Sequence, residues 1–255
     1  MKLFESIADW QAFRKTAIFN EKTLGFIPTM GNLHAGHQSL LKCSIGENDF
    51  TVLSIFINPT QFNDPKDLEK YPRTLEQDLL LAQETQVDFV LLPDFKQIYP
   101  DAYRYKVTEN TLSQQFCGKF RPGHFDGVLT IVLKLLLLVK ANKAYFGEKD
   151  YQQWKLIHDM AKAFFIETEI IPCPIMRDSN GLALSSRNQR LSREEQIKAS
   201  ELYQLLISTL TIPEIQAQLK KKGFDVEYLE DYEGRRLAAV KLGEVRLIDN
   251  IALPL

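Results

Sequence analysis

The sequence predicts an α/β protein: a doubly wound, Rossmann-like parallel sheet followed by a smaller C-terminal α+β domain. Short apolar, β-branched runs alternate with helical patterns over most of the 255 residues, as expected for βαβ units. A run as continuously apolar as residues 51–57 is typical of a strand covered on both faces. From about residue 176 the pattern changes to two helices and alternating strands, so we expect domains at residues 1–175 and 176–255.

The elements of the first domain follow from where apolar runs stop. Pro28, the pair Asn58-Pro59 and Pro93 each follow a short apolar run and mark the end of a strand. We expect strands at residues 24–27, 51–57, 87–92, 144–146 and 167–171. We expect helices from about residue 34 and over residues 75–83, 128–139 and 151–165.

The second domain shows two kinds of hydrophobic pattern, one helical and one alternating. Residues 193–210 and 212–222 have the amphipathic pattern of helices, and Gly223 closes the second of them. Residues 226–229, 237–242 and 245–248 alternate as antiparallel strands do. The domain is therefore expected to be a small α+β module.

Composition excludes several classes of protein. The chain carries 31 Lys and Arg against 33 Asp and Glu, a net charge of −2, which argues against a nucleic acid partner. Its three cysteines form no CxxC pair, so neither a disulfide framework nor a zinc knuckle is expected. The apolar run 128–139 is interrupted by Lys134 and is shorter than the roughly 20 residues of a membrane span. With no apolar segment at the start, we expect a cytoplasmic protein without a membrane partner.

Two histidines follow the first strand of the large domain. His34 and His37 are three residues apart at a predicted helix start, so their side chains share a face beside the backbone N–H groups of the first turn. Those groups and the helix dipole favour an anion, and Gly31 and Gly36 would let a nucleotide approach the backbone. The spacing alone leaves three interpretations open: phosphate binding, a structural pair, or metal ligands.

Polar residues also follow the later strands. Asn58 and Gln61 supply amides suited to a hydroxy-acid substrate, although Asn-Pro is also a common turn opener. Lys149 could neutralise a phosphate, while Asp150 could cap a helix or contact ribose or Mg²⁺. Ser185, Ser186 and Arg187 could clamp an oxyanion, but such tripeptides are common in loops.

Together these clusters resemble the pantothenate synthetase (pantoate–β-alanine ligase) family, within the HIGH-motif nucleotidyltransferases. Seven stretches carry the resemblance in order along the chain: PTMGNLHAGH (28–37), SIFINPTQF (54–62), YPRT (71–74), RPGHFDGV (121–128), FGEKDYQQ (146–153), PIMRDSNGLALSSRN (174–188) and GEVRLIDN (243–250). The stretch between Leu191 and the last motif looks shorter than the resemblance leads us to expect.

The resemblance implies an ATP-dependent ligase. Pantoate would attack the α-phosphorus of ATP to give pantoyl adenylate and pyrophosphate, and β-alanine would then displace AMP to give pantothenate. The catalytic residues implied are His37, as proton donor, His34 and Lys149. ATP and Mg²⁺ would be bound, with Asp78 or Asp150 able to assist the ion, and a homodimer is expected. The implied ATP-binding residues are Met30, Gly31, Asn32, Leu33, His34, Ala35, Gly36, His37, Gly147, Glu148, Lys149, Asp150, Met176, Leu184, Ser185, Ser186 and Arg187. The implied residues for pantoate and β-alanine are Asn58, Gln61 and Gln153.

Two other functions stay open from the motifs. An adenylyl- or cytidylyltransferase of the same class would use a substrate phosphate as nucleophile and stop after pyrophosphate release. It would have no need of the amides at Gln61 and Gln153. A nucleotide-sensing module without turnover would have no reason to keep both histidines together with Lys149.

Overall fold

The computed structural model describes residues 1–254, which form two compact units. Unit 1 comprises Met1–Leu33, His37–Gly147 and Gln152–Cys173. Unit 2 comprises residues 174–254 together with two short segments from earlier in the chain, His34–Gly36 and Glu148–Tyr151. Both short segments belong to the motifs that follow the first and fourth predicted strands.

Unit 1 is built on a six-stranded parallel sheet in the order β1-β4-β3-β2-β5-β6. Its strands are β1 (Lys2–Phe4), β2 (Leu24–Thr29), β3 (Phe50–Ile55), β4 (Phe89–Leu91), β5 (Lys143–Gly147) and β6 (Glu169–Cys173). The order reverses direction between β2 and β5, which makes the carboxyl ends of these two strands the topological switch point where such sheets bind ligands.

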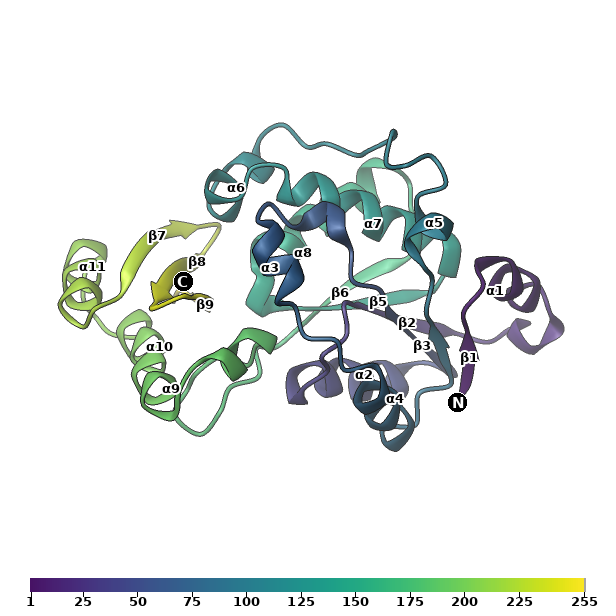
Figure 1. Ribbon diagram of the computed structural model, residues 1–255, viewed down its shortest axis with the longest axis horizontal. Coiled ribbons are helices and arrows are strands. Elements are labelled where there is room, and N and C mark those ends of the chain that lie inside the picture. Colours follow the sequence, from purple (N-terminus) through teal and green to yellow (C-terminus); the bar gives the residue numbers. More distant parts are fainter. Residues whose placement is uncertain (255) are drawn as a thin grey trace. The chain divides into compact units, whose positions relative to one another are not determined.

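Helices cover both faces of this sheet. Figure 1 shows α2 (Ala35–Glu47) and α4 (Leu75–Glu84) on one face, and α7 (His124–Val139) and α8 (Tyr151–Ala163) on the other. The shorter helices are α1 (Ile7–Arg14), α3 (Pro65–Glu69), α5 (Phe95–Ile98) and α6 (Cys117–Phe120), with 3-10 turns at η1 (Ala17–Phe19), η2 (Pro59–Gln61), η3 (Leu112–Gln114) and η4 (Glu148–Asp150). The prediction of a doubly wound parallel sheet is confirmed, as is the buried helix at 128–139.

Strand β2 continues through Pro28, where the sequence predicted its end. The carbonyl of Leu24 accepts from the N–H of Asn142 on the β5 side, and the carbonyl of Thr29 accepts from the N–H of Phe56 on the β3 side. Because the backbone groups of successive residues in a strand point to alternate sides, the nitrogen of Pro28 faces β5. Pairing with β5 covers only Gly25 and Phe26. The missing N–H of the proline therefore costs the sheet no hydrogen bond.

The sequence reading missed the first strand and helix. β1 is three residues long and extends the sheet beside β4. An aromatic cluster holds it there: Phe4 contacts Trp10 at a ring-centroid distance of 5.3 Å and Phe13 at 5.0 Å. The spacing of these aromatic residues was the available signal, because a strand of three residues has no readable period.

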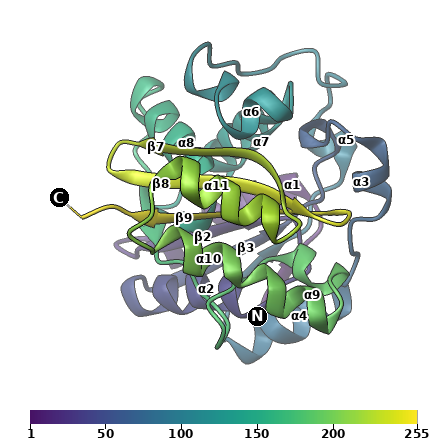
Figure 2. The ribbon, with the colours of Figure 1, turned by 90° about the vertical axis from the view of Figure 1, so that its left-hand side faces the viewer.

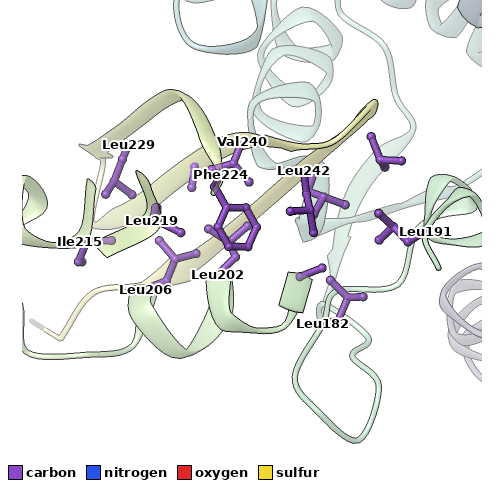
Figure 3. Packing of buried hydrophobic residues seen from close by; sticks show 14 residues of the cluster. Leu182, Leu191, Leu202, Leu206, Ile215, Leu219, Phe224, Leu229, Val240 and Leu242 are labelled. Atoms are coloured by element: carbon purple, nitrogen blue, oxygen red, sulfur yellow. The ribbon is translucent and has the colours of Figure 1, made fainter. Parts of the chain in front are cut away.

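Unit 2 contains a three-stranded antiparallel sheet of β7 (Asp225–Tyr232), β8 (Arg235–Leu242) and β9 (Val245–Ala252). Figure 2 shows α10 (Glu201–Leu206) and α11 (Ile212–Lys221) lying along this sheet. Its core joins Leu202 and Leu219 of the helices to Leu229, Val240 and Leu242 of the strands (Figure 3). The predicted α+β module is confirmed.

The helix predicted over residues 193–210 is divided. It consists of α9 (Arg193–Ala199) and α10, separated at Ser200, and it follows the 3-10 turn η5 (Ser186–Arg190). The hydroxyl of Ser200 donates to the carbonyl of Ile197 at 2.6 Å, a local bond that competes with the regular helical ladder. Among residues 1–254, no helix combines the length and apolarity of a membrane-spanning segment.

Candidate active site

The turn after β2 is held by a buried carboxylate. Gly31 and Asn32 both adopt positive φ, +78° and +51°, so two consecutive backbone N–H groups point into one concavity. Asp78, 2 % exposed on the first turn of α4, accepts from both Asn32 (2.9 Å) and Leu33 (2.7 Å). Its Oδ2 also accepts from the hydroxyl of Thr74 at 3.2 Å. The anion in this backbone concavity is therefore the protein's own carboxylate.

All three backbone N–H groups from Gly31 to Leu33 donate to side chains of the protein. The amides of Asn32 and Leu33 donate to Asp78, and the amide of Gly31 donates to the hydroxyl of Thr29 at 3.2 Å. Each of these three amides therefore has a hydrogen-bond partner within the protein. A Cβ at Gly31 would lie 2.9 Å from Asp78 Oδ2, so glycine allows the carboxylate its close approach.

His34 is a neutral imidazole with a defined tautomer. Its Nδ1 accepts from the backbone N–H of Gly36 at 3.1 Å, so the ring proton is carried by Nε2. Burial, together with the nearby cation of Lys149, lowers the pKa of His34 from 6.5 to about 4, and Asp150 partly opposes the shift. At neutral pH His34 can thus donate one hydrogen bond but carries no positive charge. His37 lies half-buried on the first turn of α2.

Asn58 and Gln61 occupy the turn after β3. Asn58 is 1 % exposed, and its Oδ1 accepts from the hydroxyls of Thr60 (2.9 Å) and Tyr99 (2.9 Å). Its Nδ2 donates to Gln61 Oε1 at 3.1 Å and to the carbonyl of Gly127 at 3.2 Å. Both ends of the Asn58 amide thus have partners within the protein, and one of them is the Gln61 amide. Burial raises the pKa of Tyr99 to about 12.

The start of α7 supports the same turn, which the sequence analysis did not foresee. His124, 7 % exposed, places Nδ1 2.7 Å from the carbonyl of Gln61, and its Nε2 lies 3.0 Å from Arg121 Nη1. A Cβ at Gly127 would lie 2.4 Å from the carbonyl oxygen of Thr60 and 2.6 Å from the nitrogen of Gln61. These residues form the RPGHFDGV motif, whose spacing alone gave no role.

The motif after β5 contains a 3-10 turn and the start of α8. The ammonium of Lys149 is 3.8 Å from Asp150, with 17 % of the lysine side chain exposed. Of the two glutamines that follow, Gln152 is buried and binds the backbone of Leu112, Gln115 and Cys117, which makes it structural. Gln153 is half-buried at the next position of α8.

In unit 2, the segments 176–178 and 182–187 lie side by side. The N–H of Leu184 donates to the carbonyl of Met176 at 2.9 Å. Arg177 and Ala183 form an isolated antiparallel β-bridge. Ser185 caps the η5 turn through the N–H of Arg187 at 3.2 Å, and Ser186 is buried within that turn. A Cβ at Gly36 would lie 3.8 Å from the side chain of Leu184, so these two residues of unit 2 are neighbours.

A small pocket, partly open to solvent, adjoins this segment. It is lined by Lys149, Leu182, Ala183, Ser185, Asn188, Leu202, Leu247, Ile248 and Asp249. Unit 2 thus brings together Lys149 and Ser185 with residues of β9. Within residues 1–254, no three His, Cys, Asp or Glu side chains gather as a metal site.

The fold and the polar residues described above define a class of protein. A doubly wound parallel sheet, polar motifs at its switch point and a cationic, hydroxyl-bearing loop are typical of α/β enzymes that bind a nucleotide. The sequence profile of the pantoate-beta-alanine ligase family matches residues 2–252. The chain belongs to this family, whose reaction joins pantoate to β-alanine, and the resemblance seen in the seven motifs is confirmed.

Individual relatives agree along the whole chain. A pantothenate synthetase of Coxiella burnetii is 54 % identical over 250 residues, covering 98 % of this chain and 96 % of its own length. One of Bdellovibrio bacteriovorus is 50 % identical, with 99 % of each chain covered. These two relatives are matched almost end to end, so this chain is about as long as they are.

Solved structures show the same fold. A pantoate-β-alanine ligase from Francisella tularensis, crystallised with "Beta-gamma ATP and Beta-alanine", superposes with a TM-score of 0.94 at 41 % identity, covering 99 % of this chain and 97 % of that one. A pantothenate synthetase from Thermus thermophilus superposes with a TM-score of 0.90 at 36 % identity, with both chains fully covered.

Proposed function

We propose that this chain makes pantothenate in two steps. The pantoate carboxylate attacks the α-phosphorus of ATP, forming the acyl phosphate bond of pantoyl adenylate as pyrophosphate leaves. The amine of β-alanine then attacks the acyl carbon, AMP leaves with the bonding electron pair, and the nitrogen loses a proton. The full-length match to ligases of this family, one of them crystallised with an ATP ligand and β-alanine, carries the proposal.

ATP is assigned to the histidine motif and to the loops of unit 2. Lys149 and Arg187 supply positive charge, while Ser185 and Ser186 supply hydroxyl donors for phosphate oxygens. The assignment extends to Met30–His37, Gly147–Asp150, Met176 and Leu184–Arg187. For Gly31, Asn32 and Leu33 we propose an indirect part, since their amides are committed inside unit 1.

The two histidines have different parts in this proposal. Neutral His34 donates through Nε2 to a phosphate oxygen and adds no net charge. His37 donates to the oxygens on which negative charge grows as pyrophosphate leaves, where a positioned donor stabilises the transition state. Electrostatic positioning of this kind suits a reaction in which the reacting groups are supplied by the substrates.

Pantoate is assigned to Gln61 and Gln153, with β-alanine beside Gln61. Asn58 orients Gln61 through a 3.1 Å hydrogen bond and is proposed as a supporting residue. The amide of Gln61 offers both a donor and an acceptor, which matches the hydroxyl and carboxylate groups of a hydroxy acid.

Magnesium is proposed to arrive with ATP, held mainly by the phosphates. The described residues form no cage of protein ligands, which fits an ion carried by its substrate. Asp150, beside Lys149 and 47 % exposed at its side chain, is the carboxylate able to assist, whereas both oxygens of Asp78 already accept backbone hydrogen bonds. When bound, the ion would neutralise charge on the departing pyrophosphate.

The deciding experiment follows two products. Pyrophosphate and AMP release are measured from Mg²⁺-ATP with pantoate, with and without β-alanine. We expect AMP and pantothenate in equal amounts only when both substrates are present. Pyrophosphate without AMP, with a phosphorylated acceptor, would indicate a plain nucleotidyltransferase, and ATP binding without turnover would indicate a sensor.

The cellular setting is a separate proposal. We expect a homodimer in the cytoplasm, divided between a nucleotide- and pantoate-binding domain at residues 1–175 and a lid domain at 176–255, a division supported by the two compact units. Sedimentation at micromolar concentration measures the oligomeric state. A monomeric mass for a fully active enzyme would contradict the dimer.

A further inference from the structure

The last motif of the sequence, GEVRLIDN, ends in two buried polar residues with no assigned role. Asn250, 2 % exposed on β9, donates from Nδ2 to the carbonyl of Glu148 at 2.8 Å and to the carbonyl of Lys149 at 3.1 Å. One amide group thus holds two consecutive carbonyls of the η4 turn, roughly a hundred residues earlier in the chain.

The same turn is held from strand β8. Arg235 Nη1 donates to Asn250 Oδ1 at 2.5 Å, and its Nη2 pairs with the carboxylate of Glu148 at 2.5 Å. The guanidinium also lies 4.7 Å from the ring centroid of Tyr151. Glu148 is therefore fixed at its backbone and at its side chain, and Lys149, the next residue, has its carbonyl fixed as well.

Asp249 holds a second loop, the segment that contains Arg177. It is 5 % exposed and forms a two-pronged ion pair with Arg177, at 2.6 and 2.8 Å. Arg177 also donates to the carbonyl of Gly181 at 3.0 Å, and its guanidinium lies 3.8 Å from the ring centroid of Tyr203. Arg177 is adjacent to Met176, whose carbonyl accepts from Leu184.

The strand that carries both residues is itself firmly packed. Leu247 of β9 belongs to the core of unit 2. Figure 3 labels Leu202, Val240 and Leu242 of the same core. Asp249 and Asn250 are successive residues, so their side chains leave opposite faces of the strand. One rigid strand can therefore fix two separate loops.

We propose that Asn250 is a positioning residue that sets where Lys149 meets the ATP phosphates, and that Asp249 sets the 176–184 segment through Arg177. The inference rests on the proposed ATP-binding role of Lys149 and Leu184–Arg187. It explains why a motif at the end of a small sheet accompanies nucleotide-binding motifs far away in the sequence. A displaced lysine ammonium loses phosphate interaction steeply with distance.

The substitution Asn250→Asp tests this with almost no change in shape. It replaces the donor Nδ2 by an oxygen that faces two carbonyl oxygens, so the η4 turn must move. We expect the Kd for Mg²⁺-ATP, measured by calorimetry without pantoate, to rise about tenfold. The KM for pantoate should stay within about twofold of the wild-type value.

Glu227→Gln is the matched control. Glu227 of the same sheet has 8 % of its side chain exposed, and its carboxylate pairs with Arg246 of β9 at 2.7 Å and with Lys241 of β8 at 3.6 Å, both within the sheet. Both variants should lower the unfolding temperature of the protein. If Glu227→Gln weakens ATP binding as much as Asn250→Asp does, Asn250 acts through general stability and the proposal is overturned.

A double-mutant cycle separates this proposal from the proposed function. If Asn250 acts through Lys149, then Asn250→Asp should change ATP affinity less than about twofold in a Lys149→Ala background. Equal effects in both backgrounds would overturn the positioning role. If Lys149→Ala itself leaves ATP affinity unchanged, the proposed role of Lys149 fails instead. Should Asn250→Asp not fold, Asn250→Ala, which removes the donor without adding charge, is measured in its place with the same two outcomes.

Discussion

The N–H of Leu33 donates to Asp78 Oδ1 at 2.7 Å, which joins the loop after β2 to a helix 45 residues later in the chain. Hydrogen bonds from backbone N–H groups to a carboxylate are roughly twice as strong as those between neutral groups. Asp78→Asn replaces one acceptor by a donor directed at an N–H group. We expect a loss of about 1–3 kcal/mol in the free energy of unfolding.

The same substitution should also reduce activity. Since the loop leads directly into His34 and His37, kcat/KM for ATP should fall by about ten- to a hundredfold. The control is Glu76→Gln, an exposed carboxylate on the same first turn of α4. Equal kinetic losses in the two variants would mean that the charge of the helix terminus matters, and not the contact with the loop.

The low pKa of His34 predicts a pH dependence of stability. The unfolded chain binds a proton at this residue below about pH 6.5, whereas the folded protein does so only near pH 4. Stability from neutral His34 is thus complete above pH 6.5 and decreases as the pH falls toward 4. The difference in unfolding free energy between the wild type and His34→Ala should shrink over this window. An imidazole NMR resonance of His34 that titrates near pH 6.5 would contradict the buried neutral state.

His37 should matter to turnover more than to folding. Loss of one transition-state donor typically costs about 10²–10³ in rate, and we expect His37→Ala to lower kcat by this factor. His158→Ala on α8, a partly exposed histidine beside Asp159, should leave kcat unchanged. Wild-type turnover by His37→Ala would remove this residue from the mechanism.

Gln61 should distinguish the substrates. Gln61→Ala removes an amide but leaves the backbone contact with His124, so we expect about a tenfold weaker affinity for pantoate and little change for ATP. Titration with each substrate separately measures both values. Gln83→Ala, an exposed amide on α4, is the control, and equal weakening for both substrates would mean that the Gln61 amide is structural.

The fold was readable from the sequence to different degrees. Strands such as β3 are continuously apolar because both faces are buried, and that signal is local. The break at Ser200 depends on one side-chain hydrogen bond, and β1 depends on aromatic contacts, so neither leaves a period in the sequence. Local pattern therefore predicted the layers but not the interruptions.

The candidate site was also only partly predictable from the sequence. Motif residues such as His34 and Lys149 stand out by residue type and position after a strand. Their supports do not: Asp78, His124 and Asn250 reach their partners across 45, 63 and 102 residues respectively. The residue type of Asn58 fits a substrate contact, whereas its burial and its paired amide, which only the structure shows, fit the supporting role proposed above.

Gly127 offers the sharpest test of how the substrate turn is supported. An alanine Cβ there would lie 2.4–2.6 Å from the backbone of Thr60 and Gln61, and backbone atoms cannot rotate away as a side chain would. Overpacking of this kind costs about 1–3 kcal/mol, against a gain of about 1 kcal/mol from helix propensity. We expect Gly127→Ala to destabilise the protein and to raise the KM for pantoate more than the KM for ATP.

Gly46→Ala provides the comparison, because it makes the same change in a helix where a new Cβ meets nothing within 4 Å. There the helix propensity acts alone, and stability should rise by about 0.5–1 kcal/mol. If Gly127→Ala is as well tolerated as Gly46→Ala, the start of α7 can shift without disturbing Gln61. The close approach of helix and turn would then have no part in holding the substrate amide.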